Sequence, residues 1–406
     1  MATRRSDVVE SAFTEAARWF DDQAEAILHE QIRLCEIPAP SGQEDARASY
    51  VADAFSAIGL RVQRSAVGNV LGRRPGRAAN GGAIVVSAHL DTVFSAEQAV
   101  AVAGPGEPNP YRDGTPVPAD EYHAPGISDA AAGLAALLAL ARALAVARIE
   151  TDRELLFLAT VGEEGRGDLR GARAFFETRE GRQATAFITI DHSDPNVIVH
   201  RGIGSRRYLV EWKGEGGHSW GHFGRYNPVF ALASAAERLA QLHTPKQPRT
   251  TYNIGVVRGG ESVNAIPESA AVEVDLRSED AAQLDRLEHH FRSAVSWGHE
   301  RELERRPTGA LEPQLLQIGD RPAGTTPLDS TLVRATRAAL QAEEFTPRLI
   351  GSSTDANAAI AAGVPAIALS WGGQSDNQHS LREWFSPVDR SRALRVLLRL
   401  MLSLAQ

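Results

Sequence analysis

A histidine and an aspartate stand two residues apart at the end of a β-branched apolar run, as His89 and Asp91 in the stretch AIVVSAHLDT. Side chains two residues apart on a strand project from the same face. A carboxylate beside an imidazole can hold one ring nitrogen and leave the other free for a metal ion or a proton. An isolated pair of this kind is more commonly a polar strand end, so partners elsewhere in the chain must decide its role.

Other acidic side chains follow apolar runs in the same way. Asp129 lies in GISDAAAG, immediately before an apolar helix, where either Ser128 or Asp129 could instead serve as the helix cap. Glu163 and Glu164 leave the buried run LLFLATV together. Two adjacent acids at that position are unfavourable unless a cation compensates one of them or water solvates the turn.

Two further residues complete a candidate ligand set. Asp191 closes the strand FITID, and His379 lies in the loop after the strand PAIALSW. Nitrogen and carboxylate ligands without thiolates suit zinc, and also cobalt or manganese. Five ligands exceed one closed tetrahedral site, whereas two divalent ions that share a bridging carboxylate would use all five. The candidate metal ligands are His89, Asp129, Glu164, Asp191 and His379.

Strands and helices alternate over residues 1–203 and again over 309–406, which predicts an α/β domain with a mostly parallel sheet flanked by helices. Open sheets of this kind place their sites at the carboxyl ends of the strands. Residues 204–308 follow the order β-α-β-β-α, with room for one more strand, which predicts an inserted ferredoxin-like α+β domain. The polar stretch 61–71 is expected to be an edge strand, and residues 7–34 are expected to be helical.

Composition excludes several classes of protein. A chain of 406 residues suggests two domains, and its net charge of −8 argues against a nucleic-acid binder. The single cysteine rules out an intrachain disulfide and suits a reducing cytoplasm. The amino terminus has no apolar core typical of a secretory signal, and no window approaches the roughly 20 apolar residues of a membrane span. We therefore expect a cytoplasmic protein without membrane or nucleic-acid partners.

The motifs SAHLDT, GISDAAAG, TVGEEG, TID, GGHS and NQHS resemble those of a family of dinuclear zinc peptidases and amidohydrolases. This family includes peptidase T, carboxypeptidase G, aminoacylase and succinyl-diaminopimelate desuccinylase, and the motifs occur in the family's order over nearly the whole chain. The resemblance implies two zinc ions bridged by Asp129. His89 and Asp191 would complete one metal site, and Glu164 and His379 the other.

The resemblance also implies roles for residues beside the ligands. Asp91 would orient His89, and Glu163 would be the general base. A water shared by two divalent ions loses its proton far more readily than bulk water, and Glu163 could accept that proton and pass it to the leaving amine. One departure is Ala131, where the family often has a lysine. That lysine is not a ligand, so the predicted metal site is unaffected.

The inserted domain carries its own candidates. In the family, the histidine of GGHS, here His218, reaches across a dimer interface to stabilise the oxyanion, so the resemblance implies a homodimer through the inserted domain. Asn264 and Arg277 resemble substrate-contacting positions, although Arg277 could equally be a surface strand residue. Trp220 and His222 have no such match and are expected to pack or to line the rim. No role follows from the motifs for His123, His192 and His200.

Substrate class rests on finer features. Asp191 and the segment 352–373 resemble the peptidase T branch, which favours hydrolysis of short peptides by an aminopeptidase or tripeptidase. Arg277 could instead bind a substrate carboxylate, as a carboxypeptidase or an N-acyl-amino-acid amidohydrolase needs. A third hypothesis is a non-catalytic dimeric binding protein on a scaffold that has lost its metals. The presence of every expected ligand and of the base argues against it.

Overall fold

The computed structural model describes residues 2–78, 82–305 and 308–406. The chain divides into two compact units. The first, which we call the α/β unit, contains the described residues up to Gly202 together with Thr325–Gln406. The second, which we call the inserted unit, contains Ile203–Gly324.

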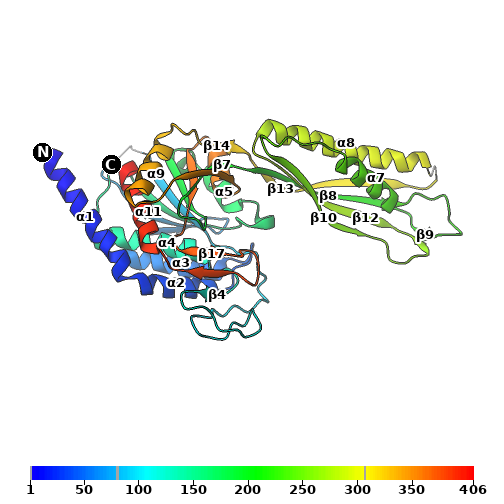
Figure 1. The fold of residues 1–406 in the computed structure, drawn as a ribbon. Helices are drawn as coiled ribbons and strands as arrows, with labels where there is room; N and C mark the ends of the chain where they lie inside the picture. Colours follow the sequence, from blue (N-terminus) through cyan, green and yellow to red (C-terminus); the bar gives the residue numbers. More distant parts are fainter. Residues whose placement is uncertain (1, 79–81, 306–307) are drawn as a thin grey trace. The chain divides into compact units, whose positions relative to one another are not determined.

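A mixed sheet of nine strands forms the centre of the described α/β unit (Figure 1). Its strands are Arg61–Arg64 (β1), Val70–Arg74 (β2), Ile84–His89 (β3), Leu155–Thr160 (β5), Ala186–Ile190 (β6), Val197–Gly202 (β7), Gly324–Thr325 (β14), Arg348–Ser352 (β15) and Ala366–Leu369 (β16). They are ordered β1-β2-β5-β3-β6-β16-β7-β14, and β15 pairs with β7. The four central strands β5, β3, β6 and β16 run parallel to one another, which confirms the predicted fold class.

Helices cover both faces of the central strands. Successive residues of a strand point to opposite faces of the sheet, so they pack in two different hydrophobic cores. Ile84 and Val86 belong to the larger core, whereas Val85 packs in the other. The helices of the larger core are Ala2–Asp22 (α1), Ala24–Glu36 (α2), Asp45–Ile58 (α3), Ala131–Val146 (α4), Thr331–Ala342 (α9) and Arg390–Ala405 (α11). Those of the other face are Arg170–Glu177 (α5), Arg179–Arg182 (α6) and Ala356–Ala361 (α10). Three short strands form a separate small sheet: Tyr122–His123 (β4), Gln374–Asp376 (β17) and Trp384–Ser386 (β18).

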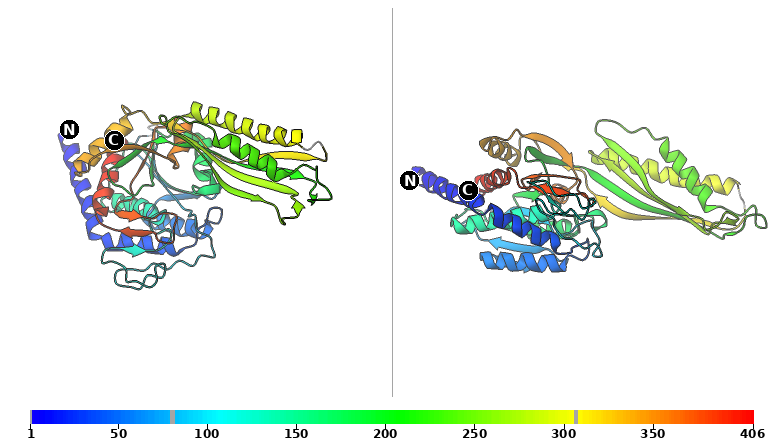
Figure 2. Two further views of the ribbon diagram at one scale, coloured as in Figure 1. Left: turned by 45° about the vertical axis from the view of Figure 1, so that its right-hand side comes forward. Right: turned by 60° about the horizontal axis from the view of Figure 1, so that its bottom comes forward.

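The inserted unit has the predicted ferredoxin-like order, including the last strand for which the sequence left room. Its main elements are Gly204–Gly214 (β8), Pro228–Ala240 (α7), Thr250–Gly259 (β10), Ser269–Ser278 (β12), Ala281–Arg305 (α8) and Leu311–Arg321 (β13). The four strands form an antiparallel sheet ordered β10-β12-β8-β13 in the described chain. Both helices lie on one side of it (Figure 2), where Tyr208, Val210 and Trp212 of β8 face them. A two-stranded ladder, Gly217–His218 (β9) with Ala265–Ile266 (β11), follows β8.

Three boundaries differ from those expected. The inserted unit ends at Gly324 rather than at residue 308, because β13 pairs with β8 along its length. The helical stretch 7–34 is divided between α1 and α2, and the stretch 61–71 contains β1 and the start of β2, joined by a turn. As expected for a polar strand, β1 lies at the edge of the sheet. No helix in the described residues is long and apolar enough to cross a membrane.

Candidate dinuclear metal site

The predicted ligands lie together at the carboxyl ends of the central strands. His89 is the last residue of β3, Glu164 follows β5, and Asp191 comes directly after β6. Because these three strands are parallel, their carboxyl ends lie side by side. Asp129 lies two residues before α4, and His379 is in the loop between β17 and β18. The structure therefore brings all five residues together.

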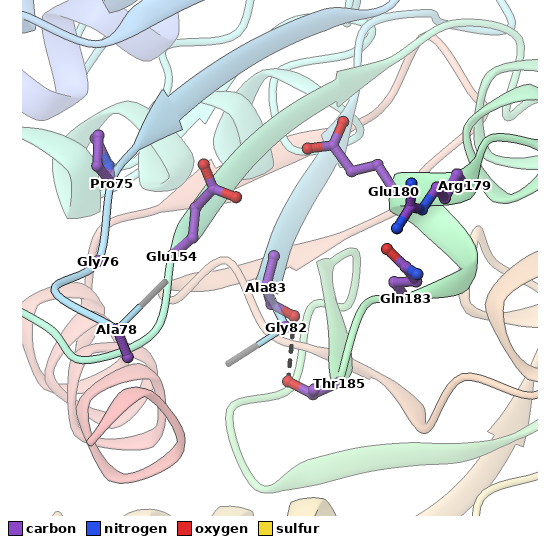
Figure 3. Close-up of a pocket in the computed structure, with 10 residues that line it drawn as sticks. All are labelled: Pro75, Gly76, Ala78, Gly82, Ala83, Glu154, Arg179, Glu180, Gln183 and Thr185. Atoms are coloured by element: carbon purple, nitrogen blue, oxygen red, sulfur yellow. Dashed lines mark hydrogen bonds between the residues drawn. The ribbon is translucent and has the colours of Figure 1, made fainter. Parts of the chain in front are cut away.

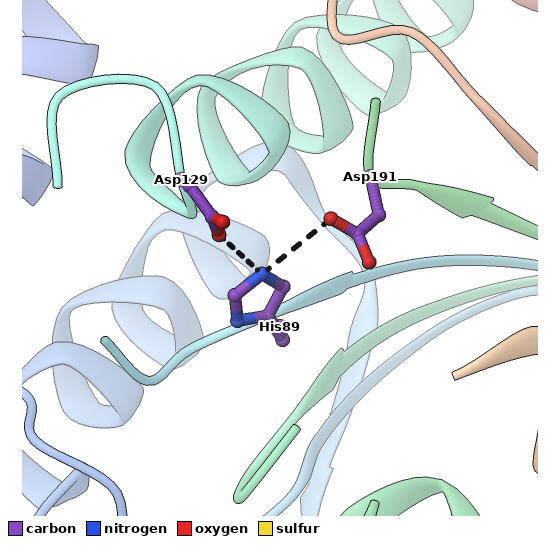
Figure 4. A group of neighbouring side chains, drawn as sticks. All are labelled: His89, Asp129 and Asp191. Carbon is purple, nitrogen blue, oxygen red and sulfur yellow. Dashed lines mark ion pairs between the residues drawn. The ribbon is translucent and has the colours of Figure 1, made fainter. Parts of the chain in front are cut away.

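The five side chains form two overlapping groups. Nε2 of His89 lies 2.8 Å from Oδ1 of Asp129 and 3.8 Å from Oδ1 of Asp191 (Figure 4). Nε2 of His379 lies 2.7 Å from Oε1 of Glu164 and 3.1 Å from Oδ2 of Asp129. In each group the possible ligand atoms all lie within 4.8 Å of one another. Asp129 belongs to both groups and directs one carboxylate oxygen to each.

The donor set and its spacing fit divalent metal ions. Ligands about 2.1 Å from a tetrahedral zinc ion are roughly 3.4 Å apart, which is close to the separations in both groups. Oδ1 of Asp129 is buried and makes no hydrogen bond within the described residues, although the ring nitrogen of His89 is near. A metal ion between these two atoms would satisfy both. Imidazole nitrogens and carboxylate oxygens without a thiolate suit zinc, cobalt or manganese.

Interactions and burial within the cluster raise the pKa values of three of its members. Hydrogen bonds to Asp129 and Glu164 raise the pKa of His379 to about 11, against the effect of burial. Burial lowers the pKa of His89, but the nearby carboxylates of Asp129 and Asp91 outweigh this and hold the pKa well above its usual range. Burial and the nearby carboxylates raise the pKa of Asp191. Such a site holds protons that divalent cations would displace.

Asp91 joins the strand of His89 to the turn that carries the adjacent acids. Its Oδ1 accepts the backbone N–H of Glu163 at 2.9 Å, and its Oδ2 accepts that of Glu164 at 2.9 Å. Its Oδ1 also lies 3.5 Å from Nδ1 of His89. The Asp91 carboxylate is fully buried; burial raises its pKa, but interactions with His89 and the hydroxyl of Ser41 outweigh this and lower the pKa to about 2. Asp91 thus positions more than the one imidazole expected from the sequence.

The two histidines of the cluster differ in exposure. The side chain of His89 is 3% exposed, whereas that of His379 is 52% exposed. Glu163, the candidate base, is buried at the end of β5 beside Glu164. Of the two histidines of the cluster, His379 is therefore the more accessible to solvent.

Two residues that contact this site were not anticipated. The hydroxyl of Ser41 donates to Oδ2 of Asp91 at 2.5 Å. The carboxylate of Glu383 accepts hydrogen bonds from the loop that ends at Asp129. The sequence offered weak signals: Ser41 stands between a proline and a glycine, and Glu383 follows His379 by four residues.

In the inserted unit, His218 and Asn264 lie close to each other. His218 is exposed on β9, and the next residue, Ser219, donates its N–H to the backbone carbonyl of Asn264 at 2.9 Å. Nδ1 of His218 accepts the N–H groups of Trp220 and Gly221. A neutral imidazole with Nδ1 as acceptor carries its proton on Nε2, so His218 presents an N–H donor to solvent.

Arg277 lies at the other end of the same sheet. It is eight residues along β12 from Ser269, a distance of roughly 26 Å at 3.3 Å per residue. The ladder that carries His218 adjoins the Ser269 end of β12. The Arg277 side chain is 41% exposed and pairs with Asp275 at 2.6 Å. The structure thus does not bring Arg277 together with His218 within one chain.

Local partners hold four further histidines, His123, His192, His200 and His222. Nδ1 of His222 accepts the N–H of His218 at 2.9 Å and so shapes the loop, while Trp220 is 89% exposed. His123 is buried and pairs with a neighbouring glutamate. His192 accepts a backbone N–H, and His200 contacts a backbone carbonyl.

A cavity of about 780 Å³ lies at the other ends of the central strands, away from the candidate ligands (Figure 3). Gly82 and Ala83 precede β3, Glu154 precedes β5 and Thr185 precedes β6, so this cavity adjoins the amino ends of the strands. It contains no predicted site residue. Residues 79–81, which follow its lining residue Ala78, are outside the described chain, and we assign it no ligand.

The strand ends of this mostly parallel α/β sheet carry two groups of histidine and carboxylate ligands, and one aspartate belongs to both groups. This combination of fold and site defines the class of dinuclear metal-dependent hydrolases. Comparison with known families agrees with this class. Residues 85–403 match the Peptidase family M20/M25/M40, and the chain belongs to this family.

Individual proteins are more distant. The chain is 29% identical over 269 residues to a probable carboxypeptidase of Aspergillus clavatus, covering 60% of this chain and 56% of that protein. It thus spans little more than half of that relative. Its fold is similar to that of aminopeptidase PepT from Bacillus cereus, with a TM-score of 0.73 and 18% identity over 94% of this chain and 99% of that one. It is also similar to the Bacillus subtilis YXEP protein, a dinuclear metal binding peptidase from the M20 family, with a TM-score of 0.66 and 16% identity over 94% and 98% of the two chains.

Proposed function

We propose that this protein hydrolyses an amide bond of short peptides with the aid of two divalent metal ions, and that the native metal is zinc. The observation that carries this proposal is the position of Asp129, whose two carboxylate oxygens face His89 and His379 in separate groups. One shared carboxylate between two ligand groups is what two neighbouring ions require. The ligand roles are those assigned above to His89, Asp129, Glu164, Asp191 and His379.

Bound ions would supply Lewis-acid activation of water and of the scissile carbonyl. Glu163 is proposed to accept the proton of the attacking water and to deliver it to the leaving amine. Asp91 fixes the backbone of Glu163 and so keeps this base at the edge of the ligand groups. His218 is proposed to donate its Nε2 proton to the developing oxyanion, with Asn264 binding substrate beside it.

Short peptides are favoured as substrates by two features. Asp191 occupies the position where the peptidase T branch has aspartate, and aminopeptidase PepT shares the fold. A second candidate is the removal of a carboxy-terminal residue or of an N-acyl group, because the relative from A. clavatus is named a probable carboxypeptidase. Arg277 would then bind the substrate carboxylate.

The geometry of the inserted unit supports a homodimer. A dipeptide is only about 7 Å long, at 3.3–3.6 Å per residue. His218 lies on β9, beside the Ser269 end of β12, and Arg277 is roughly 26 Å along β12 from Ser269 by strand rise, so one chain cannot apply both to one small substrate. If both contact the same substrate, one must come from a second copy of the chain. We also propose a cytoplasmic location, because the single cysteine, Cys35, is buried and free.

Metal analysis combined with a substrate panel tests the proposal. We expect about two ions per chain and hydrolysis of free-amino tripeptides that a chelator abolishes and added zinc restores. Asp129→Ala should lose both metal and activity, whereas Asp45→Ala, at an exposed carboxylate that pairs with Arg64, should lose neither. Cleavage of N-acetyl amino acids alone would favour the second candidate. A metal-free, inert protein would leave only a binding role.

A further inference from the structure

The carboxylate of Glu383 is buried, and the donors that hydrogen-bond to it all belong to one loop. Its Oε2 accepts the N–H of Gly126 at 2.8 Å. Its Oε1 accepts the N–H of Ser128 at 2.9 Å, the hydroxyl of Ser128 at 2.5 Å and the N–H of Asp129 at 3.0 Å. Four donors from Gly126–Asp129 therefore converge on a single side chain that lies more than 250 residues away in the sequence.

Within the part of the chain that the structure describes, the carboxylate of Glu383 has no cationic partner. Its side chain is 0% exposed, and no lysine, arginine or histidine in the described residues forms an ion pair with it. An acidic residue lies beside it, because Asp129 donates its backbone N–H to Oε1 of Glu383 at 3.0 Å. A carboxylate offers only acceptors, whereas an amide side chain would turn its NH2 group toward one of these N–H donors. The converging donors therefore require a carboxylate at this position.

The loop held by Glu383 ends at the shared acid of the candidate metal site. Asp129 donates its backbone N–H to Glu383 and directs its two carboxylate oxygens to His89 and His379. Glu383 is also fixed to the loop of His379, because its own N–H donates to the carbonyl of Ser380 at 3.2 Å. One residue thus connects the two segments that supply Asp129 and His379.

We propose that Glu383 is a positioning residue of the dinuclear site, which anchors the Gly126–Asp129 loop so that Asp129 can serve both metal positions. The inference rests on the proposed function. Glu383 touches neither substrate nor reacting atoms in this role. Its negative charge adds to that of Asp129 and strengthens the attraction for divalent cations, and residues that orient metal ligands typically contribute about 10–100-fold to metal affinity or activity.

The test is metal affinity measured directly, by competition with a zinc chelator and by calorimetry, on the full chain. In Glu383→Gln the side chain keeps its shape, but its amide group replaces one acceptor and opposes an N–H of the loop. We expect zinc to bind about 10–100-fold more weakly to at least one position, and kcat to fall with little change in KM. Glu383→Asp keeps the charge but is one methylene too short to reach all four donors, so it should not restore affinity.

Glu302→Gln is the matched control. Glu302 is 1% exposed and accepts the backbone N–H of Asn227 in the inserted unit, so its loss tests the cost of removing a buried carboxylate elsewhere. It should lower thermal stability without changing zinc affinity. If Glu383→Gln does not fold, Ser128→Ala decides, since it deletes only the hydroxyl donor and should weaken zinc binding several-fold.

The outcomes separate the two proposals. A wild-type protein that binds no divalent ion would refute the proposed function, and this inference with it. A wild-type protein that binds two ions, together with folded Glu383 and Ser128 variants of unchanged zinc affinity, would refute this inference alone.

Discussion

Replacing Asp91 by asparagine should disturb the candidate site through the backbone rather than through the imidazole. Each carboxylate oxygen of Asp91 accepts one backbone N–H, from Glu163 and from Glu164, both at 2.9 Å. Asparagine has one acceptor oxygen and one NH2 group. Whichever way the amide is turned, its NH2 group opposes one of these two N–H donors.

The size of the effect follows from burial. Asp91 is 0% exposed, so water cannot replace the lost acceptor. A buried donor without a partner costs about 1–3 kcal/mol, which lowers the folding equilibrium constant by roughly 5- to 150-fold. The turn would relieve part of this cost by shifting Glu163 or Glu164. We therefore also expect a loss of about 10–100-fold in metal affinity or kcat/KM.

Urea unfolding of the metal-free protein, zinc titration and peptidase kinetics measure the three quantities. Asp45→Asn is the control, because the Asp45 side chain is 93% exposed and pairs with Arg64 at the surface. Exposed ion pairs contribute at most about 1 kcal/mol to the free energy of unfolding, and this pair does not contact the site. If the two variants had the same stability and the same zinc affinity, the argument from the two backbone hydrogen bonds would be wrong.

Three other changes are informative. Glu163→Gln should retain metal and lower kcat by about 10²–10⁴-fold, and a variant that kept more than about a tenth of the activity would contradict the base assignment. Burial and the hydrogen bond to Glu288 raise the pKa of Tyr208 to about 12. The free energy of unfolding should therefore fall as pH rises from about 10 to 12, and Tyr208→Phe should flatten this pH dependence in unfolding titrations. In Gly133→Ala, the new Cβ would lie 2.5 Å from the carbonyl oxygen of Ile190, and urea unfolding should show a loss of about 1–3 kcal/mol; unchanged stability would disprove the tight packing.

The candidate ligands could be predicted from sequence because strand position determines them. His89 and Asp191 directly end or follow apolar runs, and parallel strands bring their carboxyl ends to one edge whatever the connecting segments do. Ser41 and Glu383 could not be predicted in this way. Each acts through a hydrogen bond to a segment distant in the sequence, and such bonds leave no periodic pattern in the chain.

The end of the inserted unit was misplaced for a different physical reason. Strand β13, with the sequence LEPQLLQIGDR, contains a proline and lies at one edge of the sheet, where most of its side chains are exposed or half-buried. Its pattern of polar and apolar residues is therefore weak, and Pro313 argues against a strand. Pairing with β8 decides its place, and pairing is a property of the folded sheet.

The sequence also does not tell which copy of the chain contributes each residue that contacts the substrate. The motifs GGHS and VDLRS provide His218 and Arg277, and neither motif indicates from which copy of the chain its residue acts. The length of β12 does bear on this, because it separates the two side chains by more than the length of a short peptide. Joint action of His218 and Arg277 on one substrate therefore requires a dimer. If a monomeric form were fully active, at least one of these two residues would have no part in binding that substrate.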